Sequence, residues 1–71
     1  MPLTMLTQGA SGVIREVRGK AEAVRHLADL GFVAGETIRV VAEQSGNLIV
    51  ELKGSRLALN KVTASRIILA E

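Results

Sequence analysis

The block Leu27-x-x-Leu30-Gly31-Phe32-x-x-Gly35 constrains the fold of this chain more than any other feature of its sequence. Gly31 follows a helical pattern of apolar residues, and glycine readily adopts the left-handed conformation that ends a helix. Phe32 then falls where this capping motif places an apolar contact back to Leu27. Gly35 allows a tight turn before a run of alternating apolar and polar residues. The block therefore predicts a helix that ends near Gly31 and is followed by a β-strand.

Length and composition indicate one small domain with an aliphatic core. A chain of 71 residues forms at most one domain, 1–71, close to the lower size limit for folding without disulfides or metals. There is no cysteine, which excludes disulfides, thiolate zinc sites and cysteine nucleophiles. Phe32 is the only aromatic residue among 48% hydrophobic residues. The others are aliphatic and often β-branched, which favours strands.

Seven glycines divide the chain into short segments, which is typical of a small β-barrel rather than a helical bundle. The only convincing helix spans 20–30, with an apolar stripe and an opposite charged face. The expected strands are 12–18, 37–43, 48–53, 56–60 and 66–70. A single helical turn is expected over 61–65. The sequence thus predicts a mostly β fold, a small and partly open five-stranded barrel with one inserted helix.

The first expected strand carries an irregular apolar pattern. Ile14 and Val17 are three residues apart, so they cannot share one face of a regular strand. A bulge or a strand end near Arg15-Glu16 would reconcile this spacing with a strand.

The register of the central hairpin depends on the length of its loop. A two-residue loop would pair Val40 with Glu51 and mix apolar and charged residues on one face. A three-residue loop, Ser45-Gly46-Asn47, instead pairs Val40 with Leu52, and we expect this longer loop. The core-facing residues of the hairpin are then Ile38, Val40, Ala42, Leu48, Val50 and Leu52.

The inventory of reactive side chains argues against catalysis. The chain has one histidine, one aspartate and no tyrosine, and its four serines lie in or beside expected turns without a nearby base. Its glycines do not have the spacing of a phosphate-binding loop. We expect no enzymatic activity, no catalytic residue and no bound cofactor.

One face of the expected helix carries candidate metal ligands. Glu22, His26 and Asp29 follow one another along this face, and they could hold a divalent cation if a second molecule completed the coordination shell. Arg25 on the same face opposes a bound cation, and structural metal sites need about four convergent ligands. The alternative, which we favour, is a solvated helix face without a metal and with ordinary charge pairs such as Arg25 with Asp29.

Charge and hydropathy argue against two further classes of interaction. The basic residues give a net charge of only +2 and are spread along the whole chain, unlike the basic face of a nucleic-acid-binding domain. With Phe32 as its one aromatic residue, the chain cannot stack bases or line a proline-rich peptide groove. No segment approaches the ~20 apolar residues that span a bilayer, and residues 1–6 do not form a secretory signal. We expect a cytoplasmic protein that neither binds nucleic acid nor inserts into the membrane.

Two surfaces are candidates for contact with a partner protein. The first is the charged helix face, and the second is the outward phase of the strands, although some residues there could instead lie beneath the helix. The candidate contact residues are Arg25, His26, Asp29, Val41, Ile49 and Ala58. Ile68 of the last strand falls on the same outward phase, and weak self-association through an exposed apolar patch stays open.

Several short motifs together resemble the FeoA family over nearly the whole chain. Each consists mostly of glycines and aliphatic residues, but their order, spacing and total length are fairly specific. The motifs are Leu3-x-x-Leu6-x-x-Gly9, Ile14-x-x-Val17, Leu27-x-x-Leu30-Gly31-Phe32-x-x-Gly35, Ile38-x-Val40, Gly54-Ser55-Arg56-Leu57-Ala58-Leu59 and Ala64-x-x-Ile67.

The resemblance implies an SH3-like small five-stranded β-barrel with one helix inserted after the first strand. It also implies a small cytoplasmic accessory protein of bacterial ferrous iron transport that works with FeoB, a membrane transporter with a cytoplasmic GTP-binding part. The family supplies no catalytic residues, and no residue of this chain is assigned as a transporter contact by match alone. The expected function is a non-enzymatic adaptor, recruited to the inner face of the membrane by its transporter.

Two other functions compete with this one. A similar domain occurs at the C-terminus of iron-dependent repressors, so a metal-responsive module could use Glu22, His26 and Asp29 to bind ferrous iron. The chain lacks the DNA-binding and metal-sensing domains of such repressors, which favours the stand-alone transport form. A small nucleic-acid-binding barrel is the second rival, and it predicts steeply salt-dependent binding to RNA or DNA.

Overall fold

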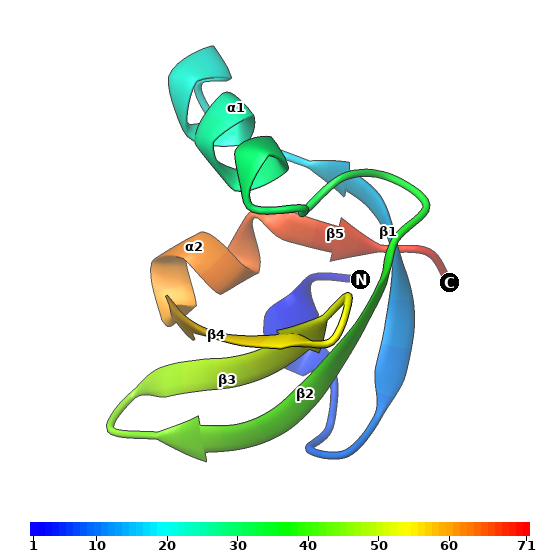
Figure 1. The fold of residues 1–71 in the computed structure, drawn as a ribbon, viewed down its shortest axis with the longest axis vertical. Helices are drawn as coiled ribbons and strands as arrows, with labels where there is room; N and C mark the ends of the chain where they lie inside the picture. The colour runs from blue at the N-terminus through cyan, green and yellow to red at the C-terminus, as the bar shows by residue number, and fades with distance from the viewer.

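The computed structural model describes all residues, 1–71, as one five-stranded sheet with two α-helices and a short 3-10 helix (Figure 1). The elements in chain order are η1 (Leu3–Met5), β1 (Ser11–Val17), α1 (Ala21–Asp29), β2 (Thr37–Gln44), β3 (Asn47–Leu52), β4 (Ser55–Asn60), α2 (Lys61–Ser65) and β5 (Ile67–Leu69). The expected strands, helix and helical turn all form, and each boundary lies within about one residue of the expected one. No helix has the length and hydropathy needed to cross a bilayer.

The strands run antiparallel in the order β4-β3-β2-β1-β5 and curve around a common core (Figure 1). β1 joins the two halves of the sheet, because its first residues pair with β2 and its later residues pair with β5. The register with β5 shifts between Ile14 and Glu16, so of the two expected alternatives the strand has a bulge there and does not end. β4 and β5 do not pair with each other, so the barrel is partly open.

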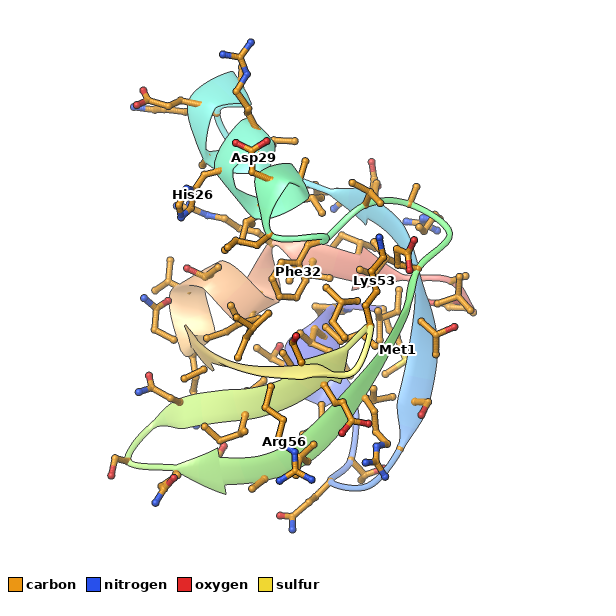
Figure 2. The ribbon with its side chains drawn as sticks, viewed as in Figure 1. Met1, His26, Asp29, Phe32, Lys53 and Arg56 are labelled. Atoms are coloured by element: carbon orange, nitrogen blue, oxygen red, sulfur yellow. The ribbon has the colours of Figure 1, made fainter.

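The core is entirely apolar, since no polar or charged side chain is buried. Phe32 is 1% exposed and lies between α1 and the strands (Figure 2). The aliphatic residues of the same cluster come from every strand, from η1 and from both α-helices. They are Leu3, Ile14, Leu27, Ile38, Val40, Leu48, Val50, Leu52, Leu59, Ala64, Ile67 and Leu69. Burial of apolar surface is therefore the main term that holds this cysteine-free chain together.

The β2–β3 hairpin closes with a two-residue turn, so the expected three-residue loop is wrong. Gln44 pairs with Asn47, which leaves only Ser45 and Gly46 in the turn. Both adopt positive φ angles, 53° for Ser45 and 81° for Gly46. Two successive left-handed residues give the tight hairpin turn whose twist matches that of the flanking strands.

A bulge in β2 explains how the shorter turn still keeps apolar residues inside. The register shifts between Val40 and Ala42, so Val40 pairs with Val50, and Ala42 pairs with Ile49. Val40 and Val50 both face the core, whereas the expected Val40–Leu52 pair does not form. The extra residue of the bulge leaves Ala42 only half-buried, which corrects its predicted core-facing position.

The first residues of the chain cover β5. Pro2 forms an isolated bridge with Ile68, and the Leu69 N–H donates to the Met1 carbonyl at 2.6 Å. This cover leaves Ile68 only 7% exposed, so its expected outward position is wrong. One edge of the sheet is therefore protected from pairing with another chain.

Candidate functional site

The C-terminal cap of α1 fixes one end of the helix to the barrel. Gly31 has a φ of 105°, and its N–H donates to the Ala28 carbonyl at 2.9 Å. The Phe32 N–H donates to the Leu27 carbonyl at 2.9 Å, which completes the two-bond cap that the sequence predicts. Phe32 and Leu27 belong to the same buried cluster, so the apolar part of the motif forms as well.

The rest of α1 projects from the barrel (Figure 1). Leu27 is its only buried residue, and Ala23, Val24 and Ala28 are half-buried. The helix stands at one end of the molecule and does not lie over the outer face of β2, β3 and β4 (Figure 1). It therefore presents most of its surface to solvent and leaves that outer face open.

The charged face of α1 is exposed, as the helical spacing predicts. The residues that line an open depression on this face are Lys20, Glu22, Ala23, Arg25, His26 and Asp29. None of the charged or imidazole side chains among them forms an ion pair or a hydrogen bond within the chain. The Arg25–Asp29 pair that the spacing allows is therefore absent.

Every acidic residue of the barrel strands and turns, in contrast, has a basic partner. Three of these exposed pairs are Glu36–Lys53 at 3.3 Å, Glu43–Lys61 at 3.2 Å and Glu51–Arg39 at 3.1 Å. Glu16 pairs with Arg18 at 2.9 Å. The hydrogen bond and the charge of the Arg18 guanidinium hold the pKa of the Glu16 carboxyl below its ordinary value, with a smaller contribution from Arg15. Each glutamate of the barrel strands and turns is thus paired, whereas no charged side chain of α1 is.

The predicted metal ligands do not form a coordination site within this one chain. Glu22, His26 and Asp29 share the exposed side of α1, but no three His, Asp or Glu side chains are placed to hold an ion together. The side chains of His26 and Asp29 point in different directions from the helix (Figure 2). A cation on this face would need ligands from a second molecule. The assignment of Glu22, His26 and Asp29 as metal ligands stays a prediction.

The outer face of β2, β3 and β4 is the second candidate surface. The strand register places Ala42, Ile49 and Ala58 side by side across the three strands, with Val41 next to them in the β2 bulge. Ile49 and Val41 are half-buried, and Ala58 is exposed. The three predicted outer residues therefore lie close together on a face that α1 leaves open.

A charged row borders this apolar patch. Arg39 of β2, Glu51 of β3 and Arg56 of β4 are register partners across the sheet. Both guanidinium groups lie near the Glu51 carboxylate, at 3.1 Å for Arg39 and 3.6 Å for Arg56. This row was not predicted from the sequence. The alternation of core-facing and outward-facing residues in each strand would have indicated it.

Sequence comparisons find one family over the whole chain. A family model described as the FeoA domain matches residues 1–71. A protein of Methanocaldococcus jannaschii named Fe(2+) transport protein A is 24% identical over 70 residues, which cover 99% of this chain and 85% of that protein. Both matches thus extend from one end of the barrel to the other.

Solved structures share the architecture. The crystal structure of Stenotrophomonas maltophilia FeoA complexed with zinc, described as a prokaryotic SH3 domain protein, has a TM-score of 0.87 at 32% identity. That similarity covers 99% of this chain and 89% of the other. A manganese-dependent transcriptional repressor has a TM-score of 0.89 at 20% identity, over 99% of this chain and 35% of the repressor, which shows a shared fold alone. The fold is an SH3-like small barrel, as expected.

Proposed function

Because the chain belongs to the FeoA family of ferrous iron transport accessory proteins, we propose that it binds an FeoB-type membrane transporter and carries out no reaction of its own. In this proposal the chain acts in the cytoplasm, where such a transporter carries its GTP-binding part. It works as a rigid adaptor that needs no cofactor, no nucleic acid and no insertion into the membrane.

The observation that carries this proposal is the set of unpartnered charges on α1. Glu22, Arg25 and Asp29 alternate in sign along a projecting helix, and no ion pair within the chain has to break before they meet a partner. Complementary charges across an interface raise association rates and select the correct partner. A helix with free charges of both signs is therefore suited to a partner surface that also carries both signs.

The outer sheet supplies a second, apolar contact in this proposal. Val41, Ile49 and Ala58 lie on a face that no other element of the chain covers. Protein contact sites typically have an apolar centre with a polar rim, which is the arrangement on this face. The two surfaces are separate, so variants can test them one at a time.

Co-purification with the ferrous transporter from the same genome is the first test. Retention of the wild-type chain would be measured with the transporter free of nucleotide, bound to GDP and bound to a GTP analogue. Specific retention supports the adaptor function, and dependence on nucleotide assigns the contact to the GTP-binding part. Absence of retention in every state overturns the proposal.

Two variants then locate the interface. Arg25→Glu reverses an unpartnered charge and should weaken retention by about tenfold without a change in folding. Arg15→Glu is the control for a charge reversal away from α1, because Arg15 is an exposed arginine of the barrel, 53% exposed at its side chain, that pairs with Glu16 at 3.5 Å. Ile49→Ser should weaken retention if the outer sheet takes part. Normal binding by both Arg25→Glu and Ile49→Ser would place the interface elsewhere.

A second candidate function is a metal-responsive regulator. The observation that favours it is the zinc complex of the 32% identical S. maltophilia FeoA. We propose as this alternative that Glu22, His26 and Asp29 bind ferrous iron together with ligands from a second molecule, and that the metal changes the association with the transporter. Anaerobic calorimetric titration with ferrous iron tests it: saturable binding that His26→Ala abolishes supports the alternative, and no heat of binding excludes it.

A further inference from the structure

The two edges of the sheet differ in how they are covered. β5 has Met1 and Pro2 against it, whereas β4 pairs with β3 on one side and with no strand on the other. A free edge of this kind presents unpaired backbone groups to which another extended chain can bind. The sheet can therefore be continued at β4.

The backbone hydrogen-bonding groups of successive residues in β4 point alternately toward β3 and away from it, and those that point away are free. The turn at 53–54 has two residues, both with positive φ, so its flanking pair Leu52–Ser55 exchanges backbone hydrogen bonds. Every second residue then bonds to β3, and the N–H and C=O groups of Arg56 and Ala58 point away from it. No hydrogen bond outside the strand ladders reaches either residue, and both are exposed. These backbone groups therefore face water, because buried ones are almost always paired.

The surroundings of this edge are basic. Between residues 52 and 70 the chain has four basic residues and no acidic one. Lys53 precedes β4, Arg56 belongs to it and Lys61 follows it; Figure 2 shows Lys53 beside the β3–β4 turn and the Arg56 side chain extending from β4 over the neighbouring strands. Their ion pairs with glutamates elsewhere in the barrel are exposed, and such pairs contribute little stability. The basic groups are therefore available to acidic side chains of an added strand.

Like charges disfavour pairing of two copies through β4. Antiparallel pairing centred on Leu57 aligns the free groups of Arg56 with those of Ala58 in the second copy. The same register brings Lys53 of one copy beside Lys61 of the other, and like charges that face each other across a strand pair are destabilising. An acidic occupant meets no such repulsion.

We propose that the free edge of β4 binds an extended acidic segment of a partner protein as a sixth strand, held by the backbone groups of Arg56 and Ala58. Acidic side chains of the segment pair with the basic residues around the edge, which favours acidic over neutral or basic segments. This binding goes beyond the adaptor function and does not rest on it: it uses the free backbone groups of β4, whereas the proposed adaptor contact on the outer sheet uses side chains, that of Ala58 among them.

Amide hydrogen exchange measured by NMR with a synthetic peptide tests the proposal. The probe is a short peptide of alternating glutamate and valine residues, and the control is the same peptide with lysine in place of glutamate. The acidic peptide should slow exchange of the Arg56 and Ala58 amides by about tenfold, and the lysine peptide should leave it unchanged. Binding that leaves both amides unprotected, or equal protection by the two peptides, overturns the proposal.

Variants at the edge provide the second test. Ala58→Pro removes a free N–H without removing a bond to β3, so it should weaken binding of the acidic peptide by about tenfold. Ala58→Ser keeps the N–H and should bind like the wild type. Arg56→Glu reverses the charge at the edge and should also weaken binding, which keeps the test decisive if Ala58→Pro does not fold. Unchanged binding by a folded Ala58→Pro or Arg56→Glu variant overturns the proposal.

Discussion

The barrel and α1 differ in how many of their side chains are buried or ion-paired within the chain. Of the 13 residues in the buried cluster, α1 supplies only Leu27. The glutamates of the barrel strands and turns all pair with lysine or arginine, whereas the charged residues of α1 pair with nothing in the chain. The charged side chains of α1 can therefore bind another protein without breaking an ion pair within the chain. The difference indicates that stability is concentrated in the barrel and recognition on the helix.

Phe32 connects the two regions, and its truncation should give the largest effect. Phe32→Ala removes the largest fully buried side chain, so it should lower the free energy of unfolding by about 3–5 kcal/mol. That loss is a large fraction of the total stability of a small domain. Urea denaturation followed by circular dichroism measures it. Val33→Ala, at a position 38% exposed, should cost less than about 1 kcal/mol, and equal losses would contradict the central place of Phe32.

A substitution that disturbs the packing of the helix cap on the barrel should cause an intermediate loss of stability. Gly31→Ala forces a left-handed alanine, which costs about 1–2 kcal/mol, and its Cβ would lie 3.1 Å from Leu52 Cδ2. Gly46→Ala is the matched control, because Gly46 also has a positive φ but has no atom within 4 Å of the added Cβ. Thermal unfolding should show a loss larger by about 1 kcal/mol for Gly31→Ala. Equal losses would mean that the cap is not packed against the strands.

The smallest effect concerns the charge pairs of the barrel. Because Arg18 lowers the pKa of Glu16 in the folded state, the pair contributes stability above the ordinary pKa of a glutamate. That contribution is lost as the pH falls through the lowered folded-state pKa. Arg18→Gln should raise the Glu16 pKa toward its ordinary value, which an NMR titration of the side-chain carboxyl measures. Arg25→Gln on α1 should leave the Glu16 pKa unchanged; a shift there would mean that the two regions are electrostatically coupled.

The helix cap and the first bulge could be predicted because each depends on residues close together in the sequence. Gly31 and Phe32 ended the helix as expected, since the cap needs only one left-handed residue and one apolar neighbour. The spacing of Ile14 and Val17 excluded a regular strand and left a bulge or a strand end, of which the bulge forms.

The β2–β3 register could not be predicted in the same way. The shorter turn shifts the pairing by one residue and the β2 bulge shifts it by one more in the same direction, so Val40 pairs with Val50 instead of Leu52, and core-facing residues again meet core-facing residues. Alternation of apolar residues cannot distinguish these two shifts from a longer turn in a regular strand. The choice depends on how the curved sheet packs, which involves residues far apart in the sequence.

The exposed face of α1 followed from its helical period, but its isolation did not. Spacing of three or four residues allows the Arg25–Asp29 pair without requiring it. The position of the helix at the end of the barrel follows from its cap at Gly31 and from the core position of Phe32. The sequence therefore predicted which α1 residues would be exposed, and the structure was needed to find that they have no partners.

The pairing of β1 with β5 delays completion of the fold during protein synthesis. Val17 pairs with Ile67, so a strand that is made early waits for one that is made much later. A nascent chain can form the β2–β3–β4 meander from local contacts, while the β5 side of the core stays open. Closing such a long loop is slow, and the exposed apolar surface is vulnerable to aggregation until it closes. The chain therefore reaches its finished state only once residues 67–69 have left the ribosome.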